Sequence, residues 1–126
     1  MSKILIDTSV WISYFRDKNS HSSLNEYIKN NQICTNKLIL SELLPFLKIN
    51  KKTKLIKTII EISEIKLTID WDFIINLQIQ NLKNGINKIG IPDLIILDNV
   101  IQNNLVLYTE DKHFQLMKKI IKFETI

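Results

Sequence analysis

The sequence contains few of the residues that turn-rich, disulfide-bonded or membrane-spanning proteins need. It has two glycines, two prolines and a single cysteine, Cys34, among 126 residues. So few glycines and prolines argue against an all-β fold with many tight turns. One cysteine excludes an intramolecular disulfide and a cysteine zinc site, and it favours a reducing compartment, so we expect a cytoplasmic protein. No apolar run approaches the roughly 20 residues of a membrane span, and we expect no membrane partner.

The rest of the composition is that of an ordinary globular chain. Hydrophobic residues make up 45% and charged residues 24%, which suits a protein that buries one core. The sequence shows no internal repeat, linker or break in composition, so we expect residues 1–126 to form a single domain. The net charge of +4 permits a polyanionic partner without establishing one.

Hydrophobic periodicity predicts that strands and helices alternate along the chain. Strands are predicted at residues 3–7, 33–35, 64–69, 105–109 and 120–124. Helices are predicted at residues 8–16, 21–31 (with Ser20 or Ser22 as its cap), 37–48, 51–63, 71–84, from Pro92 onward, and 112–119. This alternation favours an α/β fold with a parallel sheet covered on both faces. Such sheets bind ligands beyond the carboxyl ends of their strands, where the strand order reverses.

Four carboxylates stand out from apolar surroundings: Asp7, Glu42, Asp93 and Asp111. Asp7 ends the strand 3–7, and Asp111 comes shortly after the strand 105–109. Asp93 lies in the first turn of a helix, and Glu42 lies inside another, between Leu38 and Phe46. Each acid also has a structural interpretation. Asp7 and Asp93 are suited to capping a helix, Asp111 to a turn, and Glu42 to a buried ion pair.

Taken together, the four acids favour a divalent metal site. Carboxylates that crowd into one cleft repel one another unless a cation neutralises them. Oxygen ligands, without a cysteine set or a histidine pair, point to Mg²⁺ or Mn²⁺. A metal of this kind binds a phosphate oxygen and lowers the pKa of an attacking water, so hydrolysis of a phosphate ester is the expected chemistry.

The segments ILIDTSVWI, LILSELL, IPDLIIL and LVLYTEDKHF, in this order, resemble the PIN domain, and specifically the VapC-type toxins of bacterial toxin–antitoxin pairs. The resemblance covers essentially the whole chain. It implies a three-layer α/β/α fold with a central parallel sheet of about five short strands, and it implies a metal-dependent endoribonuclease. It further implies a homodimer, an RNA substrate such as tRNA or rRNA, and a VapB-like antitoxin whose tail covers the cleft.

The resemblance also assigns roles to individual residues. It makes Asp7, Glu42, Asp93 and Asp111 the catalytic residues that bind Mg²⁺ (or Mn²⁺), with Asp111 acting directly or through water. It matches Thr8, Ser9 and Thr109 to hydroxyl positions that orient these acids or a water.

Two parts of the chain depart from the family pattern. Leu97 and Asp98 stand where family members often have small residues. Asp98 lies about 140° around the helix from Asp93, so we expect a surface charge that points away from the cleft rather than a fifth ligand. Pro45 falls inside the helix 37–48, where it removes a hydrogen bond and could displace Glu42.

Basic residues cluster after Glu42, and this cluster has two interpretations. Lys48, Lys51, Lys52, Lys54 and Lys57 fall within ten residues, and Arg16 is the only arginine. They form either a solvated helix face or, for Arg16, Lys48, Lys51 and Lys52, a contact with an RNA backbone.

The histidines and tryptophans are expected to have structural roles. We expect His21 and His113 to be structural or exposed, and Trp11 and Trp71 to pack in the core.

Three other functions remain open at this point. A phosphoacceptor receiver domain would use Asp70 as the acceptor, but it needs paired acids at the first strand end and only Asp7 is there. A haloacid-dehalogenase-type phosphatase needs an aspartate where Ser9 stands. The third alternative is a catalytically inactive PIN-fold binding protein. Metal-dependent RNA cleavage distinguishes the ribonuclease from all three.

Overall fold

The order of the strands creates a switch point in the middle of the sheet. The computed structural model describes residues 2–126, apart from the side chains of residues 18 and 20. Its strands are β1 (Ile4–Ile6), β2 (Ile33–Thr35), β3 (Ser63–Glu64), β4 (Val106–Tyr108) and β5 (Glu124–Thr125). All neighbours pair in parallel, in the order β3-β2-β1-β4-β5. The chain builds outward from β1 on one side and then returns to the other, so the strand order reverses between β1 and β4.

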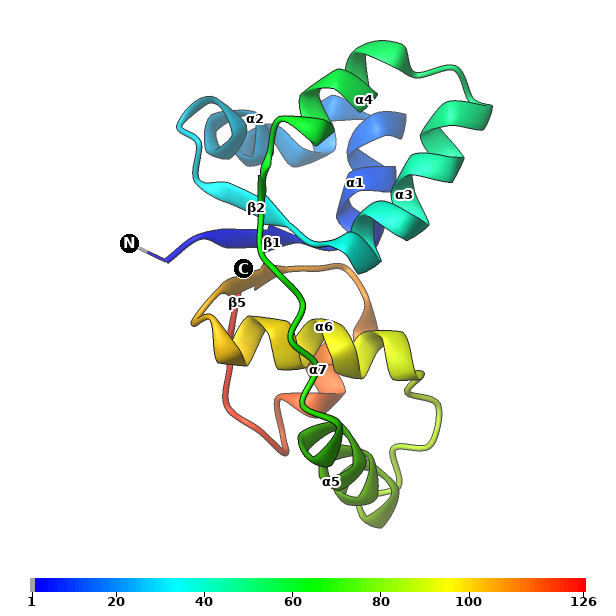
Figure 1. Cartoon of the computed structure of the whole chain (residues 1–126), viewed down its shortest axis with the longest axis vertical. Coiled ribbons are helices and arrows are strands. Elements are labelled where there is room, and N and C mark those ends of the chain that lie inside the picture. The colour runs from blue at the N-terminus through cyan, green and yellow to red at the C-terminus, as the bar shows by residue number, and fades with distance from the viewer. Residues whose placement is uncertain (1) are drawn as a thin grey trace.

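Helices cover both faces of this sheet. They are α1 (Thr8–Arg16), the 3₁₀ helix η1 (Lys18–His21), α2 (Ser22–Lys29), α3 (Lys37–Ile49), α4 (Thr53–Ile60), α5 (Trp71–Lys83), α6 (Ile91–Gln102) and α7 (Lys112–Met117). Figure 1 shows α1 to α4 on one side of the sheet and α5 to α7 on the other. This arrangement confirms the expected three-layer α/β/α fold with a central parallel sheet.

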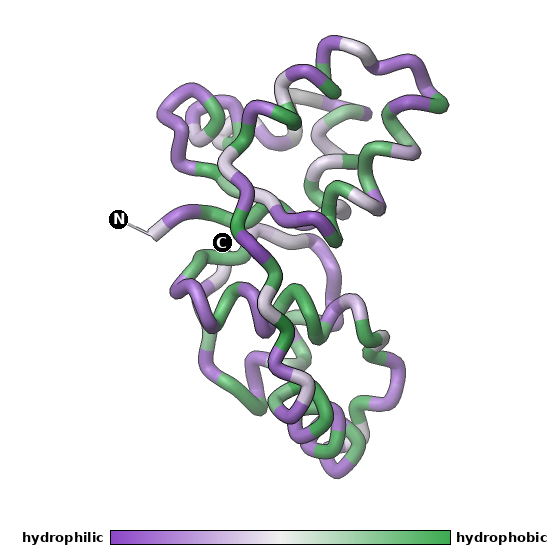
Figure 2. The backbone as a smooth tube through the Cα atoms, viewed as in Figure 1, coloured by the Kyte–Doolittle hydropathy of each residue, from purple (hydrophilic) through white to green (hydrophobic). Residues whose placement is uncertain are grey.

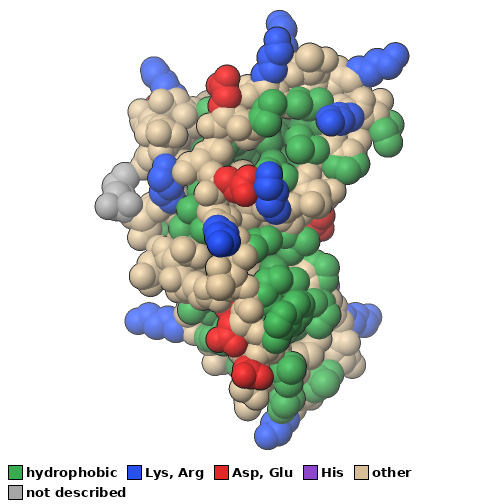
Figure 3. Space-filling view, viewed as in Figure 1, with side chains coloured by type: hydrophobic (Ala, Val, Ile, Leu, Met, Phe, Trp, Pro, Cys, Tyr) green, Lys and Arg blue, Asp and Glu red, His purple; other side chains and the backbone are tan. Residues whose placement is uncertain are grey.

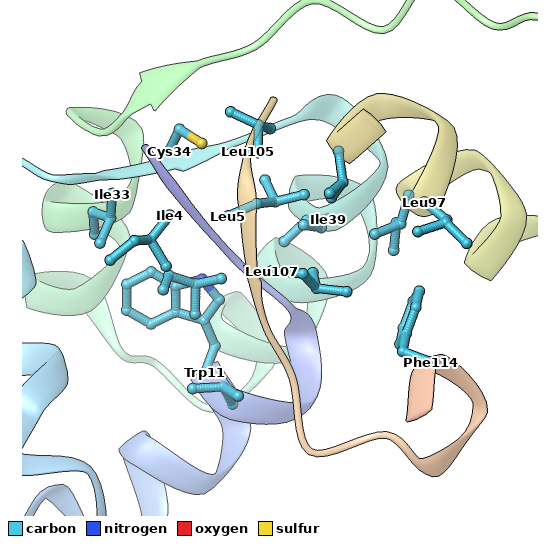
Figure 4. Close-up of a cluster of buried hydrophobic side chains, with 14 of the residues drawn as sticks. Ile4, Leu5, Trp11, Ile33, Cys34, Ile39, Leu97, Leu105, Leu107 and Phe114 are labelled. Atoms are coloured by element: carbon cyan, nitrogen blue, oxygen red, sulfur yellow. The ribbon is translucent and has the colours of Figure 1, made fainter. Parts of the chain in front are cut away.

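The hydrophobic core fixes the helices that carry the acidic residues. The central strands are almost entirely apolar, as expected for a parallel sheet that is covered on both faces. Trp11 of α1 packs on one side of the sheet, and Leu97 of α6 and Phe114 of α7 on the other (Figure 4); each is at most 1% exposed. Burying side chains of this size contributes about 1.5–3 kcal/mol each. The positions of α1, α6 and α7 relative to β1 and β4 are therefore well determined.

The predicted strand 64–69 is largely wrong. Only Ser63 and Glu64 pair as β3, and the next residues run as an extended segment from one helical layer to the other (Figure 1). Apolar and polar residues alternate along this segment (Figure 2), but its backbone is bonded by side chains of α6. Asn99 Nδ2 donates to the Lys66 carbonyl at 3.2 Å, and Gln102 Nε2 donates to the Thr68 carbonyl at 2.8 Å. The hydrogen-bond partner of this segment is therefore a helix, α6, and not a neighbouring strand.

Other predicted boundaries need smaller corrections. The predicted helix 21–31 shortens to α2, with His21 ending η1, and the helix 51–63 shortens to α4. The predicted strand 120–124 overlaps β5 only at Glu124. Ser22 is the first residue of α2 rather than its cap, and the Ser20 side chain lies outside the described residues.

Trp11 is buried as expected, whereas Trp71 is 55% exposed, so its predicted place in the core is wrong. Within residues 2–126, no helix combines the length and apolar character needed to cross a membrane.

Candidate active site

Asp7 stands at the switch point, directly after β1. It is 6% exposed, and its Oδ2 accepts hydrogen bonds from Ser9 Oγ at 2.9 Å and Thr109 Oγ1 at 2.8 Å. Asp7 occupies the N-cap position of α1, but its side chain makes no capping hydrogen bond there. The expectation that Asp7 also caps α1 is therefore wrong. Its carboxylate is oriented by two hydroxyl groups instead.

Thr109 connects the two central strand ends. Its Oγ1 donates to Asp7 and accepts from the backbone N–H of Asp111 at 3.0 Å. Ser9 Oγ accepts from the backbone N–H of Glu110 at 3.1 Å. The loop after β4 is thus bonded to the residues after β1, and the hydroxyls of Ser9 and Thr109 both donate to Asp7.

Glu42 faces the same region from α3. Thr8 Oγ1 donates to Glu42 Oε1 at 3.3 Å, so the hydroxyl of Thr8 contacts Glu42 rather than Asp7. Glu42 is exposed, not enclosed by Leu38 and Phe46 as expected. Partial desolvation nevertheless raises its pKa, as do the charges of Asp7 and Asp93, while the Thr8 hydrogen bond opposes this rise. α3 continues through Pro45, and Glu42 stays within reach of the other acids.

Asp93 lies in the first turn of α6. Gly90 is the N-cap residue and Pro92 follows within the first two helical positions, where no N–H donor is needed. The side chain is half-buried, and burial is the largest cause of its raised pKa. The charges of Asp111 and Asp7 raise it further, whereas a hydrogen bond and the charge of His113 lower it. Asp93 is thus a carboxylate that is held close to other negative charges.

Asp111 and His113 complete the group from the start of α7. Asp111 Oδ1 accepts from the His113 backbone N–H at 2.9 Å, so Asp111 caps α7. His113 Nδ1 lies 3.1 Å from Asp93 Oδ2 and 3.6 Å from Asp111 Oδ1. One ligand atom from each of Asp93, Asp111 and His113 lies within 4.8 Å of the others. Asp7 and Glu42 flank this group closely enough for their charges to act on it.

His113 is the residue that sequence reasoning misplaced. The prediction that it is structural or exposed gave weight to its buried neighbours Phe114 and Met117. In the structure its ring is 35% exposed and contacts two of the predicted metal ligands. The signal that could have found it was its spacing, two residues after Asp111 at the start of a short helix.

The donor set fits a divalent cation. Among the described residues, no lysine or arginine forms an ion pair with Asp7, Glu42, Asp93 or Asp111. Burial is the main cause of the raised pKa values of Glu42 and Asp93, and repulsion by the neighbouring carboxylates raises them further. Oxygen atoms with one nearby imidazole are ligands that Mg²⁺ or Mn²⁺ accepts.

Asp98 does not belong to this group, and it is not a surface charge either. It is 4% exposed, accepting from the Asp70 backbone N–H at 3.0 Å and from Gln102 Nε2 at 2.9 Å. The expected orientation away from the acids is confirmed, but the carboxylate fixes the start of α5 instead of facing solvent. Arg16, Lys48, Lys51 and Lys52 are exposed and lie outside the acidic group.

A hollow of about 370 Å³ adjoins the acidic group through His113. Its other walls come from residues 84–89 and from α7 and the turn after it, including the apolar Ile86 and Leu116. Asn84, Asn87, Lys88 and Lys119 add amide and ammonium groups. The acidic group therefore adjoins a hollow with a mixed apolar and polar lining, which is large enough to hold part of a substrate.

A parallel α/β/α sandwich with an acidic group at its switch point defines the class of this protein. A family model described as the PIN domain matches residues 4–120. The chain therefore belongs to the PIN-domain family, a family of nucleases. This membership overturns the receiver and phosphatase alternatives. Asp70, the proposed phosphoacceptor, caps α5 by accepting from the Phe73 backbone N–H.

Two solved structures share this fold over nearly their whole length. One is the DNA-bound VapBC from Salmonella typhimurium, with a TM-score of 0.78 and 16% identity, covering 100% of this chain and 98% of that one. The other is VapBC2 from Rickettsia felis bound to a DNA fragment from its promoter, with a TM-score of 0.74 and 21% identity, covering 98% and 96%. Comparison with curated protein sequences gave no match.

Proposed function

We propose that this protein is a metal-dependent endoribonuclease of the VapC type, a toxin that a cognate antitoxin inhibits. One observation carries the proposal. In a PIN-domain chain, four carboxylates without a lysine or arginine partner meet at the switch point of the sheet. A bound Mg²⁺ or Mn²⁺ would supply charge neutralisation, polarise a phosphate oxygen and lower the pKa of a water.

The protein's own residues prepare this chemistry. The hydroxyls of Ser9 and Thr109 fix one oxygen of Asp7, which leaves the other for a cation. Asp93 and Asp111 offer oxygens from two different helix starts, and Thr8 orients Glu42 across from them. Preorganised ligands of this kind do not have to reorient during the reaction, which is where much of the catalytic effect of electrostatics comes from.

The surface around the site suits an RNA strand. Lys88 and Lys119 line the hollow beside His113, and exposed lysines at the turn between α3 and α4 add positive charge beyond Glu42. Phosphate contacts of this kind give affinity without much sequence preference. With Arg16 as the only arginine, few bidentate contacts to bases are available, so the shape of a tRNA or rRNA loop would determine the choice of target.

The proposed partners are a VapB-like antitoxin and a second copy of the chain. Both solved neighbours are VapBC complexes. α5 carries an apolar stripe formed by Trp71, Ile75, Ile79 and Leu82, which are 55%, 55%, 42% and 59% exposed. Figure 3 shows hydrophobic side chains gathered over this part of the molecule. An exposed patch of this kind usually marks a protein contact. It therefore supports an interface with the antitoxin or with the second copy of the chain.

The direct test is cleavage of a mixed tRNA and rRNA pool by purified, antitoxin-free protein with Mg²⁺, with Mn²⁺ and with chelator. We expect discrete fragments that require metal. Asp93→Asn should reduce the rate by about a hundredfold or more, the size of effect seen when one transition-state contact is lost. Asp72→Asn is the matched control, because Asp72 also lies in the first turn of a helix but is exposed on α5.

Three other results would change the conclusion. Wild-type cleavage by Asp93→Asn would remove Asp93 from the mechanism. Metal binding without cleavage would indicate a narrow target or a different phosphate substrate. Neither metal binding nor cleavage would leave a PIN-fold protein that only binds its partner.

A further inference from the structure

His113 is held in place by the same features that hold the acids. Phe114 and Met117, both fully buried, anchor α7 in the core, and Asp111 caps its first turn. The preceding loop is fixed by the hydrogen bond between the Asp111 N–H and Thr109. The imidazole therefore cannot move far from Asp93, and its Nδ1 atom faces the carboxylates.

The distances in this group match those between ligands of one ion. Ligands about 2.1 Å from an octahedral ion lie roughly 3.0 Å apart when adjacent and roughly 4.2 Å apart when opposite. His113 Nδ1 is 3.1 Å from Asp93 Oδ2 and 3.6 Å from Asp111 Oδ1, and the whole group fits within 4.8 Å. The three side chains are therefore close enough to share one ion.

We propose that His113 is a nitrogen ligand of the metal ion, through Nδ1, beside Asp93 and Asp111, and that the site consequently prefers Mn²⁺ to Mg²⁺. This inference rests on the proposed function, because it assumes that the acidic group binds a divalent ion. It goes beyond the carboxylate ligands by naming a further ligand and the class of metal.

The preference follows from the chemistry of imidazole. Mg²⁺ favours oxygen ligands and dehydrates reluctantly, so it gains little from a histidine. Transition metals bind imidazole well, and Mn²⁺ also accepts carboxylate oxygens. A mixed set of two carboxylates and one imidazole therefore selects Mn²⁺ over Mg²⁺, while the flanking Asp7 and Glu42 add negative charge that attracts either ion.

A different role for His113 would give the same 3.1 Å distance. If Nδ1 carries a proton, it donates to Asp93 Oδ2 and orients that carboxylate without binding metal. A ligand nitrogen must instead be unprotonated. The two roles differ in whether the imidazole nitrogen is bonded to the ion, which magnetic resonance of Mn²⁺ measures directly.

The composition of the chain makes this measurement unusually specific. There are two histidines, and His21 pairs with Glu110 through Nε2 at 2.6 Å and with the Tyr108 hydroxyl through Nδ1 at 3.1 Å. His21→Asn is therefore a matched control for His113→Asn. Labelling histidine alone with ¹⁵N distinguishes imidazole from every other nitrogen in the protein.

The experiment is pulsed electron paramagnetic resonance of the full chain loaded with Mn²⁺. We expect a directly coordinated nitrogen signal in wild type and in His21→Asn, a change of this signal on ¹⁵N-histidine labelling, and its loss in His113→Asn. Calorimetric titration should show that His113→Asn loses about tenfold or more in Mn²⁺ affinity, and much less in Mg²⁺ affinity. Thermal unfolding of each variant confirms that it is folded.

Each outcome bears on one of the two proposals or on both. Mn²⁺ bound in an Asp93-dependent way, but without histidine coupling in wild type, would overturn the role of His113 and leave the nuclease proposal intact. Histidine coupling in a protein that cuts no RNA would support the role of His113 as a ligand and overturn the nuclease proposal. Failure of wild type to bind either metal would overturn both. The labelled wild type and His21→Asn decide the question even if His113→Asn does not fold.

Discussion

Thr109 is a single hydroxyl on which two acidic residues depend. It is 8% exposed, donates to Asp7 and accepts from the Asp111 N–H. A buried hydroxyl with two partners orients both of them, because rotating away from either would leave a polar group unpaired. Its effect on any bound metal would therefore be indirect, through the positions of the ligands.

Thr109→Val keeps the shape of this side chain and removes both hydrogen bonds. We expect the free energy of unfolding to fall by about 1–3 kcal/mol, since the Asp111 N–H and Asp7 each lose a partner. We also expect metal affinity to fall about tenfold or more. Chemical denaturation and Mn²⁺ titration measure the two effects. Thr58→Val is the control, because the exposed Thr58 hydroxyl bonds only to the Lys54 carbonyl of its own helix. Equal effects of the two substitutions would contradict the prediction.

The burial of Asp93 close to other acids predicts a pH dependence of the metal-free protein. The folded state raises the pKa of Asp93, chiefly by burial, above the ordinary value of 3.8. The folded protein therefore holds this proton more tightly than the unfolded chain, and its free energy of unfolding falls as the pH rises through the folded pKa. With chelator at pH 7, Asp93→Asn should melt a few degrees higher than wild type.

This difference should disappear as the pH is lowered below the ordinary value of 3.8, where the wild-type side chain is protonated in both states. Saturating metal should also reverse it, because only wild type keeps the full ligand set. Melting curves at several pH values, with Asp72→Asn alongside, provide the measurement. A lower melting temperature for metal-free Asp93→Asn at pH 7 would show that the carboxylate stabilises the fold.

At the scale of elements, α6 does two separate tasks with two aspartates. Its first turn presents Asp93 to the site, whereas Asp98, on another side of the helix, receives the backbone N–H at the start of α5. The amides of Asn99 and Gln102 bond the extended segment before α5. α6 thus holds the crossing of the chain between the two helical layers.

Asp98→Ala should destabilise the protein without changing the chemistry. The Asp70 N–H would lose its charged acceptor, so we expect a loss of about 1–3 kcal/mol in the free energy of unfolding. The cleavage rate of the folded fraction should stay unchanged. Asp72→Ala should cost about 0.3–1 kcal/mol, the usual contribution of an exposed acid in a first helical turn. A selective loss of cleavage in Asp98→Ala would place Asp98 in the mechanism.

The sequence was sufficient to predict the layers of the fold and the neighbourhood of the acids. Apolar strands that end in Asp7 and Asp111 predict a shared edge, because parallel strands expose their carboxyl ends together. Tertiary contacts determined the rest. The alternating segment 65–69 is bonded by side chains of helix α6 instead of pairing with a strand. Asp98 accepts a hydrogen bond at the start of α5, and His113 contacts Asp93. Local periodicity contains no information about such partners.

At the scale of the whole molecule, two groups of lysines lie apart from the acidic group in different directions. Lys48, Lys51 and Lys52 are exposed at the end of α3 and in the turn that follows, at least six residues beyond Glu42. Lys29 and Lys122 precede β2 and β5, so they lie toward the opposite edge of the sheet. We expect RNA that enters the site to contact the first group of lysines, whereas it would reach the second group only by wrapping around the sheet.

This distribution predicts which lysines contribute to RNA binding. In an Asp93→Asn background, which prevents cleavage, Lys51→Gln with Lys52→Gln should reduce the slope of log affinity against log salt by about 1–1.5, at roughly 0.7 per lost contact. Lys29→Gln with Lys122→Gln removes the same charge and should leave the slope nearly unchanged. Fluorescence anisotropy at several salt concentrations measures both. Equal reductions would mean that net charge, rather than position, governs binding.

The central pairing of β1 with β4 has a consequence during translation. Thr109 bonds to Asp7 across 102 residues of chain, and β4 inserts beside β1, a strand that is translated long before it. Until β4 has been made, a growing chain that already carries Asp7, Glu42 and Asp93 cannot assemble them, because domains fold as units once their last strands are available. Under the proposed function, this order would keep the site unassembled, and RNA near the ribosome uncut, until β4 has been made.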